Sequence, residues 1–286
     1  MPEELPREFD PPLERCPICD DAGIAPYHRD YRGIAISRCR RCGVQFMNPQ
    51  YTDAYLAAFY ARYIAEEYPF GPEILAVSLQ RRREVLALIG QHVPVGRLLS
   101  IGCGDGIELE IARQQGWTVE GYDVDPATTE RVASKLGVPV YSGDLCGLRL
   151  PEAGYDCVYM DQVLEHPKRP QDCLREARRL LRPGGVLFIG CPNIRSIASA
   201  WKTFMEKLGL KRRNRGRHYD TQHHLFYYSP GVLRRILQRH YGFRVLLAQG
   251  DPLVWKRKLP GRLYVFLRHR LPCLDSTFRV LARREQ

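Results

Sequence analysis

Four cysteines near the start of the chain form two closely spaced pairs, Cys16 with Cys19 and Cys39 with Cys42. A C-x2-C turn brings two thiolates to one side of a metal ion, and two such turns about 15 to 20 residues apart are typical of a zinc site. Four thiolates complete the tetrahedral coordination of zinc, so the predicted ion is structural and no position is open for catalysis. The alternative is a set of buried cysteines or a redox dithiol that binds no metal.

A glycine-rich stretch, LLSIGCGDG at 98–106, is the second group of residues with chemical meaning. An apolar run ends there in glycine at every second position, which is typical of a strand that turns into a helix around a ligand held close to the backbone. The dinucleotide fingerprint requires G-x-G-x-x-G or a final alanine, and Ile107 stands at that last position instead. A cradle for a pyrophosphate is therefore not favoured.

The elements that position these residues alternate between strands and helices from about residue 97 to residue 190. This order predicts an α/β fold with a parallel, doubly wound sheet. We expect four parts in all: a leader and zinc ribbon, a helical cap, the α/β domain, and a basic C-terminal segment (1–50, 51–94, 95–250 and 251–286). Within the last of these, 263–269 is predicted to be a strand or part of an amphipathic helix.

Five motifs in register, spread over about residues 72 to 250, resemble those of the class I S-adenosylmethionine-dependent methyltransferases. They are GCGDG, VEGYDVDP, SGDL, YDCVYMDQVLEH and LRPGGVLFI. The resemblance implies a Rossmann-like, seven-stranded sheet and S-adenosylmethionine as the cofactor. It assigns a methionine-binding loop to the glycines, the ribose hydroxyls to Asp123, and the adenine to Asp144 and Leu145. The implied cofactor-binding set is Gly102, Cys103, Gly104, Gly106, Asp123, Val124, Asp144, Leu145, Asp161 and Gln162.

Ser100 departs from the family pattern. The family usually carries Asp or Glu two residues before the first glycine, where the acid helps to organise the loop around the methionine amine. A serine can form a hydrogen bond but supplies no charge. Cofactor affinity is the property that this departure calls into question.

Two histidine motifs narrow the resemblance. DQVLEH and HHLFYYSPGVLRRIL are similar to a broad bacterial subgroup that tailors polysaccharides, lipids and natural products, with ubiquinone-type O-methyltransferases among its relatives. CPIC and CRRCGVQFMNPQ, followed by an aromatic helix, resemble methyltransferases that carry a zinc ribbon before the catalytic fold. In that subgroup a histidine at the position of His224 lies near the active site, and His166 and His223 are further candidates. Because histidine is a suitable base for a hydroxyl nucleophile, we expect O-methylation of a small-molecule, glycan or lipid-linked acceptor. The alternative for each histidine is a capping or core role.

The charge of the chain leaves other functions open. The net charge is +11, with basic clusters at 207–218 and 255–286, which favours an acidic partner such as an anionic membrane surface or RNA. An RNA base methyltransferase and a non-catalytic cofactor-binding module are therefore alternatives. No Asn-Pro-Pro-Tyr-like tetrapeptide stands at the fourth strand, which disfavours methylation of exocyclic amines.

The expected compartment follows from the N-terminus and the hydropathy. No apolar run reaches the roughly 18 residues of a spanning helix, and the acidic, proline-rich start lacks the order of a signal peptide. We expect a cytoplasmic protein, with peripheral association at the inner membrane face as an extension of that expectation.

Overall fold

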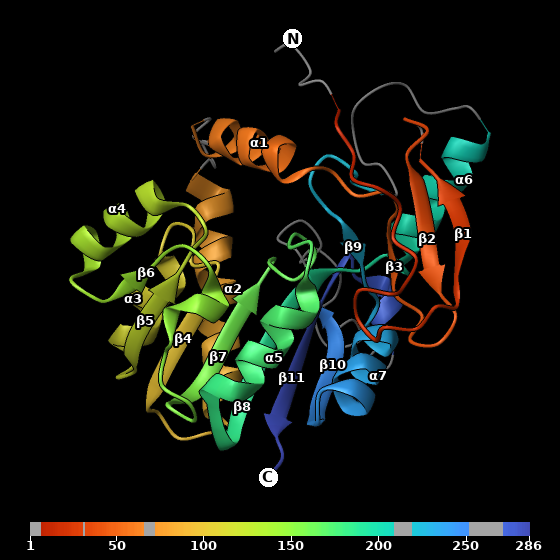
Figure 1. The fold of residues 1–286 in the computed structure, drawn as a ribbon. Coiled ribbons are helices and arrows are strands. Elements are labelled where there is room, and N and C mark those ends of the chain that lie inside the picture. Colours follow the sequence, from red (N-terminus) through yellow and green to blue (C-terminus); the bar gives the residue numbers. More distant parts are fainter. Residues whose placement is uncertain (1–6, 31, 66–71, 209–218, 252–270) are drawn as a thin grey trace.

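A seven-stranded sheet forms the centre of the molecule (Figure 1). The computed structural model describes residues 7–30, 32–65, 72–208, 219–251 and 271–286. The strand order is β10-β11-β8-β7-β4-β5-β6, and all neighbours pair in parallel except β11, which is antiparallel to β8 and β10. The strands are β4 (Arg97–Ile101), β5 (Thr118–Tyr122), β6 (Val140–Tyr141), β7 (Tyr155–Asp161), β8 (Leu181–Pro192), β10 (Phe243–Asp251) and β11 (Thr277–Arg284). The predicted Rossmann-like, doubly wound sheet is confirmed.

Strand β11 corrects the predicted domain boundary. The α/β domain was expected to end at residue 250 and to be followed by a basic segment, yet β11 is inserted between β8 and β10. Its core residues Phe278, Val280 and Ala282 are fully buried. Its arginines alternate with these residues, so the sequence of the strand resembles that of a solvated basic tail. The predicted element at 263–269 and the basic residues at 209–218 and 252–270 lie outside the described residues.

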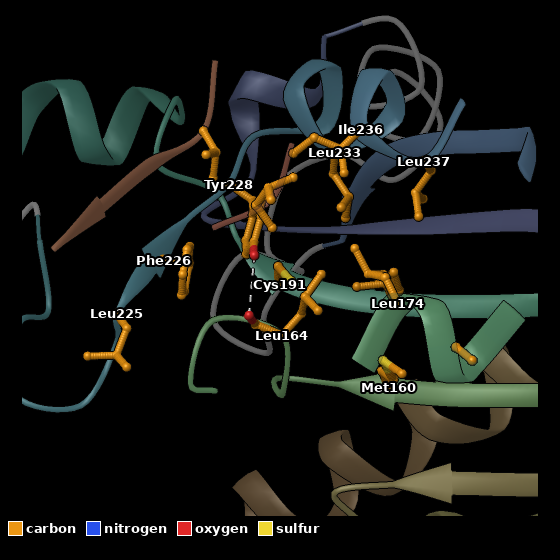
Figure 2. Close-up of a cluster of buried hydrophobic side chains, with 14 of the residues drawn as sticks. Met160, Leu164, Leu174, Cys191, Leu225, Phe226, Tyr228, Leu233, Ile236 and Leu237 are labelled. Atoms are coloured by element: carbon orange, nitrogen blue, oxygen red, sulfur yellow. Dashed lines mark hydrogen bonds between the residues drawn. The ribbon is translucent and has the colours of Figure 1, made fainter. Parts of the chain in front are cut away.

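Helices cover both faces of the sheet, because side chains on a strand alternate between faces. Along β7, Cys157 and Tyr159 pack with one buried cluster, and Val158 and Met160 with the other. The first cluster includes residues of α2 (Pro72–Gly90), α3 (Ile107–Gln114) and α4 (Pro126–Leu136), and the second includes residues of α5 (Pro170–Leu180) and α7 (Pro230–His240). Figure 2 shows part of the second cluster, which includes Met160 of β7, Leu174 of α5 and Leu233 of α7.

The cysteine-bearing segment folds into a second, four-stranded sheet of order β1-β2-β3-β9. Its strands β1 (Ile24–Arg29), β2 (Ala35–Cys39) and β3 (Gln45–Met47) come from the N-terminal part, but β9 (Phe226–Tyr227) comes from the connection after β8. This ribbon sheet lies on the α7 side of the large sheet (Figure 1). There the Tyr241 hydroxyl donates to the Ile18 carbonyl at 2.9 Å. The chain after β8 therefore contributes one strand to the ribbon sheet, and the two sheets share a buried core.

Two further helices and two 3-10 turns belong to the described residues. Helix α1 (Asp53–Ala65) follows the ribbon, and α6 (Ile197–Lys207) lies in the long connection between β8 and β9. The 3-10 turns are η1 (Leu145–Leu148) and η3 (Pro272–Leu274). Among the described residues, no helix combines the length and the apolar character needed to cross a bilayer.

Candidate functional site

The glycine loop follows β4 and holds its shape through its own backbone. Gly102, Gly104 and Gly106 all have positive φ angles, of 73°, 49° and 71°, which side chains strongly disfavour. A Cβ on Gly102 or Gly106 would collide with a valine side chain. A Cβ on Gly104 would meet nothing within 4 Å, so Gly104 is the point at which the loop backbone is open to a ligand.

Asp123, directly after β5, closes the other side of this opening. Its Oδ2 accepts the Gly104 N–H at 2.9 Å and its Oδ1 accepts the Asp125 N–H at 3.2 Å. Each carboxylate oxygen keeps a lone pair for a further donor, so two vicinal hydroxyls can still bind there. The adjacent Val124 is 62% exposed, which provides an apolar surface beside the carboxylate. The loop, Asp123 and Val124 therefore form a site that fits a nucleoside with its ribose on Asp123.

The other residues of the predicted cofactor-binding set differ in how far they are exposed. The side chains of Cys103 and Leu145 are buried in the core, so they shape the site from beneath. Asp144 is exposed and caps η1 by accepting the Cys146 N–H at 3.3 Å. Gln162 is exposed with φ 57° at the end of β7, on the same edge of the sheet as the glycine loop.

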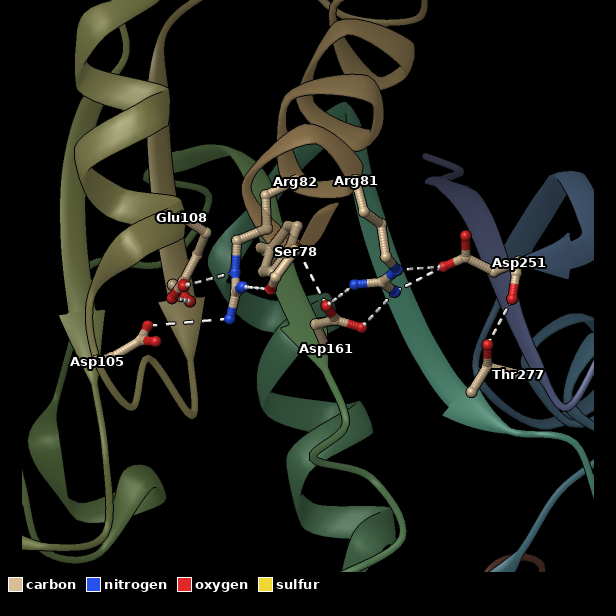
Figure 3. Close-up of polar contacts among 10 residues, drawn as sticks. Ser78, Arg81, Arg82, Asp105, Glu108, Asp161, Asp251 and Thr277 are labelled. Carbon is tan, nitrogen blue, oxygen red and sulfur yellow. Dashed lines mark hydrogen bonds and ion pairs between the residues drawn. The ribbon is translucent and has the colours of Figure 1, made fainter. Parts of the chain in front are cut away.

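The Asp161 carboxylate, which belongs to the predicted cofactor-binding set, is already paired with an arginine of this chain. It accepts two hydrogen bonds from the Arg81 guanidinium of α2, at 2.5 and 2.9 Å, and Arg81 also pairs with Asp251 of β10 at 2.6 Å. Figure 3 shows Arg81 between the two carboxylates. Burial opposes ionisation of Asp161, but Arg81 outweighs it and lowers the pKa of the carboxyl. This ion-pair network joins α2 to two strands, which is a structural function.

A carboxylate does stand beside Ser100, but it comes from a helix. The Ser100 hydroxyl donates to Oε1 of Glu108 at 2.8 Å, and both residues are buried. Figure 3 shows Glu108 reaching from α3 toward β4, with Arg82 near its other oxygen at 3.8 Å. Burial raises the pKa of Glu108 to about 7, against the attraction of Arg82. The acid missing from position 100 is thus replaced in space by Glu108.

Three histidines gather where β7 ends and where the long connection returns. The ring centroids of His166 and His223 are 5.1 Å apart, those of His166 and His224 are 4.8 Å apart, and those of His223 and His224 are 4.4 Å apart. Helix α1 contributes Tyr60, whose hydroxyl lies 3.2 Å from His166 Nδ1, and Phe59, whose ring stacks on His223. The structure therefore brings together all three histidines that the motifs suggested.

Burial sets the charge of this histidine cluster. It lowers the pKa of His166 to about 3 and lowers those of His223 and His224 as well, so the rings are neutral at physiological pH. Neutral imidazoles accept hydrogen bonds from hydroxyl groups, and three within 4.8 Å are also close enough to bind one divalent cation. Beside them, burial raises the pKa of Glu165 to about 8. Its Oε1, which makes no hydrogen bond within the described residues, lies 3.9 Å from His166 Nε2.

The ribbon sheet holds the histidine segment in place. Met47 of β3 donates its N–H to Leu225, and Leu225 donates to the Glu165 carbonyl, each at 2.8 Å. The Tyr51 hydroxyl donates to the Thr221 carbonyl, also at 2.8 Å. Backbone bonds therefore run from the ribbon, through the residue after His224, to the residue before His166.

The four cysteines converge at the end of the ribbon. Cys16 Sγ lies 3.7 Å from Cys42 Sγ, and Cys19 Sγ lies 3.7 Å from Cys39 Sγ. Zinc bound tetrahedrally at about 2.3 Å requires sulfur atoms about 3.8 Å apart, which these distances match. Burial raises the pKa of Cys19 to about 12, whereas a hydrogen bond with Cys42 lowers the pKa of Cys16 to about 6.

Sequence reasoning missed Glu108, Arg81 and Glu165. An acidic residue in the first turn of the helix after the glycine loop was the available signal for Glu108. No comparable sequence signal marks Arg81 or Glu165. Their partners are far away in the chain or are backbone groups.

Comparison with known proteins identifies the family of the α/β domain. A family model described as a methyltransferase domain matches residues 73–248, which is more than half of the chain. The chain therefore belongs to this methyltransferase family, and the predicted membership of the class I S-adenosylmethionine-dependent methyltransferases is confirmed. The matched residues lie in the α/β domain and do not include the ribbon.

Curated relatives and solved structures extend the comparison. A probable S-adenosylmethionine-dependent methyltransferase of Mycolicibacterium smegmatis is 36% identical over 115 residues, which are 40% of this chain and 45% of the relative. A ubiquinone biosynthesis O-methyltransferase of Rhizobium etli is 33% identical over 129 residues, 43% and 51% of the two chains. The chain spans about half the length of the curated relatives it matches.

Solved structures show the same fold at low identity. The 1,6-didemethyltoxoflavin-N1-methyltransferase of Burkholderia thailandensis, solved with its acceptor and S-adenosylhomocysteine, superposes with a TM-score of 0.55 at 18% identity, over 91% of this chain and 99% of that one. The CcbJ methyltransferase of Streptomyces caelestis gives 0.54 at 18% identity, over 77% and 100%.

Proposed function

We propose that this protein transfers a methyl group from S-adenosylmethionine to a hydroxyl group of a small-molecule, glycan or lipid-linked acceptor, assisted by its histidine cluster. The open backbone at Gly104, with Asp123 and Val124 beside it, is the observation that carries the cofactor site. The histidine cluster is the observation that carries the acceptor site. The name of the Rhizobium etli relative, an O-methyltransferase, supports oxygen as the acceptor atom.

The chemistry asks little of the protein beyond position and proton removal. When bound, the cofactor supplies a methyl group on a sulfonium, and the acceptor oxygen displaces the thioether from it. An alcohol oxygen becomes strongly acidic as it gains a methyl group, so a neutral imidazole suffices to accept its proton even when burial has made that imidazole a weak base. We assign this acceptance to His224, with His166 as the neighbouring base.

Two neighbouring side chains, Tyr60 and Glu165, orient the His166 ring. Tyr60 contacts Nδ1 and Glu165 faces Nε2. Because the pKa of Glu165 is raised to about 8, its carboxyl is mainly protonated at neutral pH and places no negative charge beside the imidazole. The walls of the cluster, including Phe59, exclude water from the reacting oxygen.

We further propose that Cys16, Cys19, Cys39 and Cys42 bind one structural zinc ion. The two sulfur–sulfur distances of 3.7 Å support it. The ion would fix the turns at the end of the ribbon, and the ribbon in turn positions the segment that bears His224.

The non-catalytic alternative loses its support, which was Ser100. Glu108 provides the carboxylate beside the loop, so Ser100 is no sign of a degenerate site. The RNA alternative depends on basic segments that lie mainly outside the described residues.

Two pairs of variants test the proposal. Gly104→Ala should weaken cofactor binding by more than about tenfold, whereas Gly137→Ala should not, although Gly137 has a similar φ of 64° and equally free surroundings at the end of α4. His224→Ala should lower kcat by about a hundredfold with unchanged cofactor affinity, and His240→Ala, outside the cluster, should change neither.

Transfer of labelled methyl to fractionated cell extract identifies the acceptor class. Label in small molecules, glycans or lipids supports the proposal, and label in RNA overturns it. Full turnover by His224→Ala would remove the histidine from the mechanism, and equal cofactor affinity in the two glycine variants would move the cofactor away from Gly104.

A further inference from the structure

Helix α6 and the residue after it expose four large apolar side chains, whereas two serines at the start of the helix are buried. Ile197, Trp201, Phe204 and Leu208 are 56%, 61%, 51% and 51% exposed. With about 100° between successive residues of a helix, these four lie within about 60° of arc on one face. The Leu208 N–H donates to the Phe204 carbonyl at 3.2 Å, so the stripe continues through the last turn.

The buried face fixes this orientation. Ser196 and Ser199 are buried, and the Ser196 hydroxyl accepts the Ser199 N–H at 3.0 Å at the start of the helix. The Ser199 hydroxyl donates to the Asn193 carbonyl at 3.2 Å. These bonds hold the serine side of α6 against the protein, where it packs on η3. The apolar stripe therefore cannot be turned inward without leaving buried polar groups unpaired.

The sequence of this helix and of the segment that follows it is strongly basic. Between residues 195 and 217 the sequence contains eight Lys or Arg residues and a single acidic residue, Glu206. Apolar and aromatic residues on one face of a helix, with basic residues around them, are typical of helices that lie in the interface of an anionic bilayer.

We propose that α6 docks on an anionic membrane surface, with Ile197, Trp201, Phe204 and Leu208 inserted among the lipids. A second copy of this chain fits less well, because two equally basic surfaces would repel each other. Single-stranded RNA fits less well too, because bases stack on flat aromatic rings and half of the stripe is aliphatic. The proposal is independent of the methyl acceptor.

Vesicle sedimentation of the full chain tests this surface. The protein should bind vesicles that mix phosphatidylglycerol with phosphatidylcholine, bind vesicles of phosphatidylcholine alone much more weakly, and dissociate as salt is raised. Trp201 should move to a drier environment, seen as a blue shift of tryptophan emission that Trp201→Phe abolishes.

The matched variants are W201E/F204E and Val95→Glu. Val95 is 51% exposed in the connection between α2 and β4, so it controls for one added charge at an exposed apolar position. W201E/F204E should weaken vesicle binding by at least about tenfold, and Val95→Glu should leave it unchanged. Unaltered circular dichroism and cofactor binding confirm that both variants fold.

Three outcomes would overturn the proposal. The first is no binding to anionic vesicles, and the second is equal binding by W201E/F204E. The third is concentration-dependent self-association, or binding to a single-stranded RNA oligonucleotide, that W201E/F204E abolishes while vesicle binding is absent.

Discussion

Replacing Ser100 with aspartate restores the residue type that related methyltransferases carry, and we expect it to destabilise this chain. Ser100 Oγ lies 2.8 Å from Glu108 Oε1 in a buried setting, so the new carboxylate would face an existing one. Two like charges about 4 Å apart repel by about 4 kcal/mol at an effective dielectric constant of about 20. Ser100→Asp should therefore lower the free energy of unfolding by about that amount at a pH where Glu108 is ionised.

The pKa of Glu108 sets the pH window. Burial raises this pKa from its usual 4.5 to about 7, so the folded chain retains a proton that the unfolded chain releases as the pH rises through this range. Stability consequently falls with rising pH between about 4.5 and 7, by about 3 kcal/mol for this group. Glu108→Gln removes the contribution, so its stability relative to the unaltered protein should rise by about 3 kcal/mol across the same window.

Urea denaturation of four proteins forms a double-mutant cycle: the unaltered chain, Ser100→Asp, Glu108→Gln and the double variant. At about pH 8 the Ser100→Asp substitution should cost about 4 kcal/mol more in the unaltered chain than in the Glu108→Gln background. At about pH 5 the single substitution should cost much less, because Glu108 is protonated. Ser100→Ala is the control that removes only the hydrogen bond. Unchanged stability of Ser100→Asp at high pH, with Glu108 present, would refute the spatial replacement.

Three further predictions follow from the buried charges and the cysteines. Cys42→Ser should abolish the bound zinc found by elemental analysis and lower kcat more than cofactor affinity; full metal content would contradict the four-cysteine site. Asp161→Asn should lower the free energy of unfolding by about 3 kcal/mol, because it leaves Arg81 with one carboxylate in a buried network; a loss below about 1 kcal/mol in urea denaturation would contradict it. Glu165→Gln should gain stability relative to the unaltered protein as the pH rises toward about 8, since burial raises the pKa of this carboxyl; a parallel pH profile would show that Glu165 is ionised throughout.

The sequence predicted the features that depend on short-range patterns. Strand–helix alternation predicted the parallel sheet, and the glycine spacing located the turn after β4. Cysteine spacing predicted the cluster of four thiols. Each of these rests on residues close together in the chain, where geometry and residue type constrain each other directly.

Features that depend on distant partners were not predictable. Strand β9 has two residues, too few for any alternation, and exists because β3 offers it an edge. Strand β11 is rich in arginine, so its sequence resembles that of a basic tail. In the structure these arginines bond to distant backbone carbonyls, as Arg284 does with the carbonyl of Arg179 at 3.3 Å. The motif around Asp161 predicted a cofactor-binding role, but it gave no indication that Arg81, 80 residues away, pairs with this carboxylate.

The ribbon and the histidine cluster form one mechanical unit. The connection from β8 to β9 is long, and it returns to the site only where β9 pairs with β3, Phe226 opposite Phe46. His224 stands two residues before that pair, and Leu225 between them bonds to the backbone of Glu165. Loss of the ribbon would remove the edge that β9 needs, and the histidines would lose their fixed positions while Gly104 and Asp123, held by β4 and β5, would keep theirs. The proposed zinc therefore bears on the acceptor site and not on the cofactor site, which is why its removal should separate turnover from cofactor binding.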